Sequence, residues 1–209
     1  WEDNLTFGEG EAYGMEFMFH RKKGKLNGWV SYTLSWSNSK FDNLNLGRTF
    51  YNSNDRRNQI NFVGVYNITK RWKTNVSWVF QTGNPITVAN GVVLVNSSME
   101  LPGISSNINA NPQSTLLYYS GINNFRMPNY HRLDFSISYS FKKQKSGSDI
   151  EFGVYNVYNR ENVFFYQITS TNNNTSVNQI TILPFMPFIN YTFTFKFSKS
   201  ATASIPGIP

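Results

Sequence analysis

The segment 28–41 alternates hydrophobic and polar side chains. Val30, Tyr32, Leu34 and Trp36 occupy one parity, and serine and threonine residues occupy the other. A period of two residues is typical of a β-strand with one apolar and one polar face, because successive strand side chains point to opposite sides. The segment therefore predicts a strand whose apolar face must be covered by something.

The same alternation recurs along the chain and predicts seven strands. They cover residues 13–20, 28–36, 60–68, 72–80, 133–141, 150–158 and 189–197. The sixth is ambiguous, because Tyr155 and Val157 fall on its polar parity. Five of the seven keep the pattern over nine residues. Strands of globular proteins typically have about five or six residues, whereas a tilted membrane-spanning strand needs about nine to eleven. The common length favours a layer of fixed thickness.

The connections between these strands alternate in length. Short basic turns are predicted at 21–26, 69–71 and 142–149, and long segments rich in Asn, Ser, Gly and Pro at 38–57, 82–130 and 160–187. Residues 91–95 and 116–119, inside the longest segment, are expected to continue the strands. Short turns at one rim and long loops at the other are typical of outer-membrane barrels.

The composition is poor in charge and rich in aromatic residues. Charged residues make up 15% of the 209 residues and aromatic residues 17%, while charges amount to about 25% in an average soluble domain. No window approaches the roughly 18 consecutive apolar residues of a membrane-spanning helix, which excludes α-helical membrane proteins but not membrane barrels. With no cysteine and two distant histidines, we expect no disulfide framework, no metal site and no cofactor.

The net charge of +7 is concentrated in part in three basic clusters, at residues 21–25, 70–73 and 142–145. Each cluster falls in a predicted tight turn. We interpret them as solvated hairpin tips that prevent association of sheet edges, rather than as a nucleic-acid-binding patch. No nucleic-acid partner is expected.

The two parities predict two surfaces of a membrane barrel. The residues expected to face lipid are Tyr32, Leu34, Trp36, Trp78, Phe80, Phe135, Tyr139, Phe193 and Phe195. The polar residues expected to face the lumen are Glu16, Lys73, Arg132, Asp134 and Glu151. Two alternatives remain open: a soluble β-sandwich binding module, in which a second sheet covers the apolar parity, and a complete small outer-membrane porin or adhesin.

Seven strands cannot close into an antiparallel barrel without a parallel seam, and an open sheet edge in lipid would leave backbone groups unpaired. The predicted fold is therefore all-β, an antiparallel transmembrane β-barrel of which these are about seven C-terminal strands. Residues 1–198 are assigned to this barrel portion and residues 199–209 to a C-terminal tail.

Four stretches carry a resemblance to a known family. They read GEGEAYGMEFMFHRKKGKLNGWVSYTLSWSNSKF, DRRNQINFVGVYNITKRWKTNVSWVFQTGNPIT, RMPNYHRLDFSISYSF and FGVYNVYNRENVFF. Together they resemble the C-terminal barrel region of TonB-dependent receptors of the outer membrane, especially those of Bacteroidetes-type bacteria. The resemblance spans about Gly8 to Phe197.

The resemblance implies a location in the bacterial outer membrane and a barrel of about 22 strands closed by an N-terminal plug. It implies TonB-driven uptake of a nutrient of the siderophore, cobalamin or glycan class, with the strands serving as barrel wall and the long loops as the binding mouth. The partners implied are outer-membrane lipid, the remaining barrel strands, the plug, TonB and a surface lipoprotein. The plug has no counterpart in these 209 residues.

Catalysis is not expected. His131, Asp134 and Ser136 include the residue types of a hydrolase triad. His131 shares the apolar parity, whereas Asp134 and Ser136 share the polar one, so the three cannot converge. We expect no enzyme activity.

Two groups of binding or pairing residues are predicted instead. Arg132 and Asp134 are expected to form an internal polar ladder with Glu16, Lys73 or Glu151, and Asp55–Arg57 a salt-bridge cluster at the rim. The longest loop carries exposed aromatic residues and an arginine, which suit contact with a sugar or siderophore, although packing within the loop is the simpler reading. These candidate substrate-binding residues are Tyr118, Tyr119, Phe125 and Arg126.

Overall fold

The computed structural model describes residues 6–95, 114–142, 146–171 and 174–195. Within these ranges the chain is all-β, with antiparallel pairing throughout and one short 3-10 turn, Asn45–Gly47. No helix in the described part of the chain is long and apolar enough to cross a membrane.

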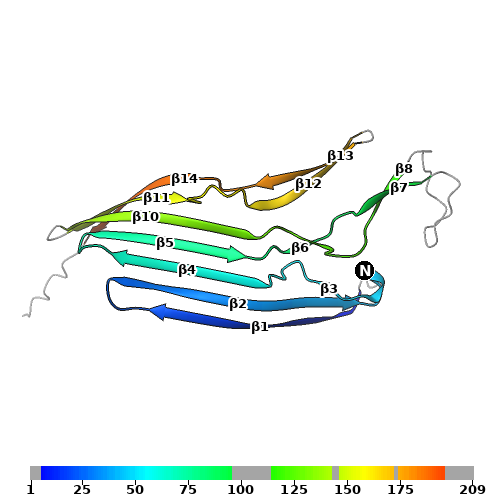
Figure 1. Ribbon diagram of the computed structural model, residues 1–209, viewed down its shortest axis with the longest axis horizontal. Coiled ribbons are helices and arrows are strands. Elements are labelled where there is room, and N and C mark those ends of the chain that lie inside the picture. The colour runs from blue at the N-terminus through cyan, green and yellow to red at the C-terminus, as the bar shows by residue number, and fades with distance from the viewer. Residues whose placement is uncertain (1–5, 96–113, 143–145, 172–173, 196–209) are drawn as a thin grey trace, which may run out of the picture.

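One large sheet dominates the structure (Figure 1). Its seven long strands lie in the order β1 (Gly8–Arg21), β2 (Leu26–Phe41), β4 (Asn58–Asn67), β5 (Trp72–Gln81), β10 (Tyr130–Lys142), β11 (Ser146–Tyr155) and β14 (Met186–Phe195). The short strand β3 (Phe50–Tyr51) pairs with β2 and makes the eighth member. The seven long strands are those that the alternation predicts, so the pattern identified each of them.

The strand boundaries differ from the prediction in several places. β1, β2 and β10 have 14, 16 and 13 residues, because backbone pairing continues beyond the ends of the predicted runs. The predicted turn 142–149 is too long, since β11 begins at Ser146. The predicted sixth strand ends too late: Asn156 has a φ of 54°, a left-handed conformation that ends the extended backbone. β14 starts earlier than predicted, and residues 196 and 197 lie outside the described part.

The long connections carry three small antiparallel pairs at one end of the sheet, the right-hand end in Figure 1. They are β6 (Pro85–Ile86) with β9 (Phe125–Arg126), β7 (Gly91–Val95) with β8 (Ser114–Tyr118), and β12 (Val163–Thr171) with β13 (Asn174–Thr181). The segments expected to continue the main strands, 91–95 and 116–119, instead pair mainly with each other as a separate hairpin. The β12–β13 hairpin was not predicted.

The register places the apolar parities of all seven strands on one continuous face. One row across the sheet pairs Phe17 with Tyr32, Tyr32 with Ile60, Ile60 with Phe80, and Phe80 with His131. Near the other end, Trp72 pairs with Tyr139, Tyr139 with Ile150, and Ile150 with Tyr191. Directly paired residues share a face in an antiparallel sheet. We call this surface the apolar face and its reverse the polar face.

The apolar face is largely exposed in this structure. Phe17, Phe19, Ile189 and Tyr191 are 57%, 69%, 61% and 66% exposed. Among residues whose side chains are described, Met127 is the one buried hydrophobic residue, at 7% exposure. The sheet therefore lacks a hydrophobic core of its own within the described ranges, and ladder hydrogen bonds and cross-strand pairs hold it together.

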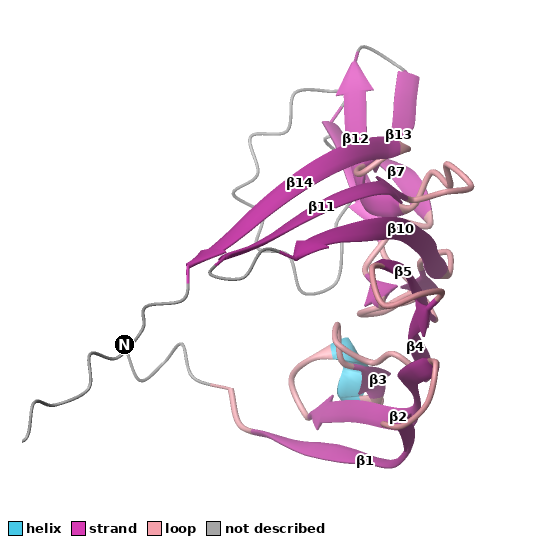
Figure 2. Ribbon diagram, turned by 90° about the vertical axis from the view of Figure 1, so that its left-hand side faces the viewer, coloured by secondary structure: helices cyan, strands magenta, loops and turns pink. Residues whose placement is uncertain are grey.

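The sheet is curved and not closed. Figure 2 shows β1 and β14 at the two ends of the arc formed by the strands. Within the described part, β1 pairs only with β2, and β14 only with β11. Six antiparallel steps separate them, so β1 and β14 run in the same direction.

Candidate functional site

The predicted lipid-facing residues all occupy apolar-face positions in the register. Phe135 and Phe193 are exposed, at 43% and 44%. The other six described side chains are half-buried: Tyr32, Leu34, Trp36, Trp78, Phe80 and Tyr139. Phe195 pairs with Ser146 at the end of β14, and its side chain lies outside the described part.

On the polar face, Arg132 and Asp134 form a close ion pair. Arg132 Nη2 lies 2.9 Å from Asp134 Oδ2, and Nε donates to both carboxylate oxygens at 3.0 Å. Nη1 donates to the Tyr130 hydroxyl at 2.9 Å, and the guanidinium lies 3.7 Å from the centre of the Tyr155 ring. This cation–π contact explains why an aromatic residue occupies the polar parity of β11.

Glu151 belongs to a second polar group that crosses four strands. Its Oε1 accepts hydrogen bonds from the Ser136 hydroxyl and from Asn75 Nδ2, the latter at 3.3 Å, and its Oε2 accepts one from Asn190 Nδ2 at 3.3 Å. Asn75 Nδ2 also donates to Ser136 Oγ at 3.0 Å. The carboxylate is thus held by hydroxyl and amide donors rather than by a basic residue.

Glu16 and Lys73 share the polar face but take part in neither group. Glu16 pairs in register with Thr33 on β2, and Lys73 with Asn67 and Ser138. Four strand spacings separate β1 from β10, or roughly 19 Å at about 4.8 Å each. The structure therefore divides the predicted ladder into the Arg132–Asp134 pair and the Glu151 group.

His131, Asp134 and Ser136 do not converge, because they lie on opposite faces of the sheet as the alternation predicts. His131 stacks on Phe80 on the apolar face, with ring centroids 6.5 Å apart. Asp134 is bound to Arg132, and Ser136 donates to Glu151, both on the polar face. The geometry joins none of these side chains in a nucleophile–base pair.

The four predicted loop contacts separate into two sites. Tyr118 and Tyr119 are 55% and 49% exposed at the end of β8. Phe125 packs edge-on against Tyr166, with ring centroids 6.1 Å apart. Arg126 forms an ion pair with Asp55. No ring contact or hydrogen bond joins the two tyrosines to Phe125 or Arg126 in the described chain.

The ion pair of Arg126 belongs to a buried junction between two long loops, residues 42–57 and residues 82–129. Asp55 is 1% exposed; its Oδ1 accepts a hydrogen bond from the Ser37 amide at 2.9 Å, and its Oδ2 lies 3.5 Å from Arg57 Nη2. Arg126 Nη1 donates to the carbonyl oxygens of Asp55 and Gly83, both at 2.9 Å. We call Asp55, Arg57 and Arg126 the Asp55 junction.

Only the part of this junction that is local in the sequence, Asp55 with Arg57, was predicted. The Asp55–Arg57 run indicates a salt-bridge cluster, but Arg126 lies 71 residues away. Further bonds tie the same loops, because Asn123 Nδ2 donates to the Tyr51 carbonyl at 2.6 Å and the Ile122 amide to Asn45 Oδ1 at 3.1 Å. The two loops are therefore joined at several points along their length.

A cavity of about 760 Å³ opens on the polar face. Its lining includes Trp29, Arg56, Asn61, Tyr130 and Phe164. No hydrogen bond or ion pair engages the Arg56 guanidinium among the described residues. Rings with amide and guanidinium donors around a half-open space suit a solute that has both polar and apolar surfaces. This cavity could not be predicted from the sequence, because its lining comes from segments far apart in the chain.

Within the described ranges, no group of three or more His, Asp or Glu side chains could hold a metal ion. Comparison of the chain with protein-family models, with curated proteins and with solved structures found no match.

Proposed function

We propose that this chain forms part of the wall of a larger outer-membrane β-barrel of the TonB-dependent receptor type. Its long loops and the polar-face cavity would then belong to the mouth through which a nutrient enters. The proposal rests on the four stretches that resemble this family and on the shape of the large sheet.

The observation that carries the proposal is the uncovered apolar face. Seven strands contribute to it, and many of its aromatic and aliphatic side chains are more than a third exposed. Removing one such side chain from water is worth about 1.5–3 kcal/mol, so a face of this extent needs a cover. The acyl chains of a bilayer would supply one, and the hydrogen-bonded groups on the reverse would face the barrel interior.

The sheet edges support a barrel with more strands than this chain supplies. In lipid, each unpaired backbone N–H or C=O costs several kcal/mol, so the outer edges of β1 and β14 need partners. These two strands run in the same direction, and pairing them with each other would create a parallel seam. Further strands, from the rest of the receptor, are the partners we propose.

The β-sandwich alternative requires a second sheet packed over the apolar face, about 10 Å away. The three small strand pairs lie at one end of the large sheet rather than over its face (Figures 1 and 2). The described part of the chain therefore offers no such cover.

The proposed cargo is a siderophore, cobalamin or glycan, and the proposed partners are a plug, TonB and a surface lipoprotein. Exposed Tyr118 and Tyr119 and the cavity around Arg56 are the surfaces on which cargo would be recognised. Arg126 is assigned instead to holding the loops, because its guanidinium is engaged by Asp55 and Gly83.

The test is the size and location of the native polypeptide. An antibody against residues 142–150 is used to probe fractions of the source cells by immunoblot. We expect a band several times the 24.1 kDa of this chain, in the outer-membrane fraction and extracted only by detergent. A band near 24 kDa would contradict the proposal: in the membrane it would indicate a small or multi-chain barrel, and in the soluble fraction a sandwich.

A further inference from the structure

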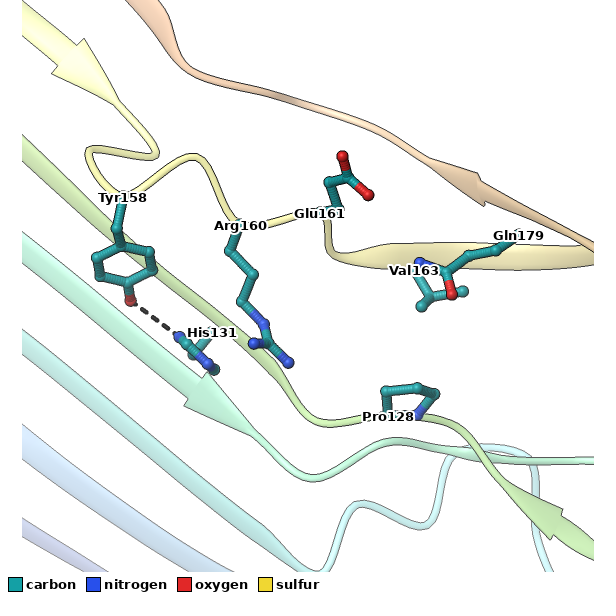
Figure 3. A pocket seen from close by; sticks show the side chains of 7 residues that line it. All are labelled: Pro128, His131, Tyr158, Arg160, Glu161, Val163 and Gln179. Atoms are coloured by element: carbon teal, nitrogen blue, oxygen red, sulfur yellow. Dashed lines mark hydrogen bonds between the residues drawn. The ribbon is translucent and has the colours of Figure 1, made fainter.

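A shallow, open groove runs along the loop end of the apolar face, where β5 and β10 meet the segment after β11. One part of it, of about 640 Å³, is lined by residues that include His131, Tyr158, Arg160 and Gln179 (Figure 3). An adjoining part, of about 360 Å³, is lined by Trp78, Phe80, His131 and Tyr158. His131 and Tyr158 belong to both parts, so we treat them as one surface, the rim groove.

The rim groove changes character along its length. At one end, Trp78 and Phe80 stack with ring centroids 6.2 Å apart and are continuous with the apolar face. At the other end lie the guanidinium of Arg160 and the amide of Gln179. A surface that passes from aromatic rings to a fixed cation within one groove is complementary to an amphiphile.

Hydrogen bonds join Trp78, Tyr158 and His131 within the groove. Trp78 Nε1 donates to the Tyr158 hydroxyl oxygen at 3.1 Å, because an indole nitrogen is a donor only. The Tyr158 hydroxyl lies 3.1 Å from His131 Nδ1. When the imidazole proton is on Nε2, the hydroxyl donates to Nδ1 and Nε2 becomes a second donor of the groove.

Arg160 is held in place by the chain around it. Its backbone amide donates to Asn156 Oδ1 at 3.0 Å, its Nε to Asn162 Oδ1 at 3.3 Å and its Nη2 to the Asn129 carbonyl at 3.0 Å. Asn156 is 0% exposed, which makes this anchor rigid. Nη1 has no partner among the described residues.

The charges around the groove favour an anion. Figure 3 shows the Arg160 guanidinium turned toward His131 and Pro128, whereas the Glu161 carboxylate points away from them. The Arg160 guanidinium and the His131 imidazole thus line the same space, and Glu161, the one carboxylate in the lining of this part of the groove, is turned away from them. Arginine is well suited to phosphate, because its planar fork of N–H donors matches the phosphate oxygens.

We propose that the rim groove binds the phosphorylated headgroup of a membrane lipid, with an acyl chain lying along Trp78 and Phe80. The inference rests on the proposed function, because it takes the apolar face to contact lipid. It adds a specific lipid site at the loop end of the wall. A free phosphate ion would use the arginine but not the aromatic floor.

The test compares two lipids that differ in the phosphorylated headgroup. The full-length native protein, extracted in a neutral maltoside detergent, is mixed with dioleoylphosphatidylglycerol or dioleoylglycerol, and bound lipid is counted by native mass spectrometry. We expect preferential binding of the phospholipid. Arg160→Gln should weaken that binding about tenfold, the usual effect of losing a charged hydrogen bond. His131→Phe, which keeps the ring and removes the donor, should weaken it less.

Arg48→Gln is the matched control, because it removes the same charge from an exposed loop position and should leave lipid binding unchanged. Unaltered heat-dependent gel mobility shows that each variant is folded. Equal binding of the two lipids by the wild-type protein, or equal losses in Arg160→Gln and Arg48→Gln, would overturn the inference. Displacement of the phospholipid by inorganic phosphate alone would indicate a free-anion site and would also overturn it.

These outcomes separate the lipid site from the proposed function. A protein that fractionates with the outer membrane but shows no headgroup preference would retain the barrel-wall proposal and lose the lipid site. A protein that is soluble without detergent would remove both.

Discussion

The two faces of the large sheet come from the same strands but are stabilised in opposite ways. On the polar face, Arg132, Asp134 and Glu151 are hydrogen-bonded to named partners within the sheet. On the apolar face, Phe17 and Tyr191 remain more than half exposed. Many polar groups of the polar face are thus satisfied within the sheet, whereas the apolar face has no cover within the described chain. The apolar side of the sheet is therefore the side that needs a cover.

The largest expected effect comes from placing a charge on the apolar face. If the apolar face contacts lipid, as the proposed function requires, Val30→Arg should destabilise the protein by about 2–4 kcal/mol, the cost of a lipid-facing arginine near the bilayer midplane. Ser31→Arg, one residue along β2 on the polar face, is the matched control and should cost far less. Urea titration of the protein in phospholipid vesicles measures both. Equal losses would show that the two faces meet the same surroundings.

The next effect concerns the Asp55 junction, which belongs to neither face. Asp55→Asn leaves Arg57 and Arg126 without their buried counter-charge. Removing one partner of a buried pair costs about 3–5 kcal/mol; since both arginine side chains are about a third exposed, we expect roughly 2–3 kcal/mol. The loss should be local, so limited proteolysis should cut segments 42–57 and 82–95 faster while the long strands stay protected.

Asp149→Asn is the control for that prediction, because Asp149 is exposed and lies near the short-turn end of β11. It removes the same charge and should leave loop cleavage unchanged. If the loops of the Asp55→Asn variant were cleaved at the same rate as those of the Asp149→Asn variant, the junction would not hold the loops together.

The smallest effect tests the packing of the polar face. Arg132→Lys keeps the charge but loses the fork that binds Asp134 and the flat contact with Tyr155. We expect a loss of about 1–2 kcal/mol, since cation–π and bidentate contacts each contribute on the order of 1 kcal/mol. Urea titration in vesicles, compared with Lys73→Arg as a reverse exchange on the same face, checks this. A loss no larger than that of Lys73→Arg would mean that only the charge matters.

Much of the fold could be predicted from the sequence, because alternation is a local property. Val30 through Trp36 define both a strand and its two faces without any knowledge of neighbours. The end of β11 was harder to predict. Tyr155 lies on the polar parity, where its ring contacts the guanidinium of Arg132, a residue on another strand. The β12–β13 hairpin was also missed, because the apolar residues of β13, Val177 and Ile180, fall on opposite parities and give no periodic signal.

The candidate sites were less predictable. Arg126 was expected at a ligand surface, yet it pairs with Asp55 across 71 residues of chain. The cavity near Arg56 and the rim groove around Tyr158 each combine segments that meet only after the strands have paired. Residue type indicates what a side chain can bind, but its partner depends on which other segment is brought beside it.

The sequence by itself determined the seven long strands, their two faces and the alternation of short and long connections, because each follows from the two-residue period of a strand and from turn-forming residues nearby. Only the tertiary structure decided the register that joins seven apolar faces into one surface, the junction at Asp55 and the donor arrangement at Arg160. These depend on contacts between residues far apart in the chain, where local periodicity carries no information.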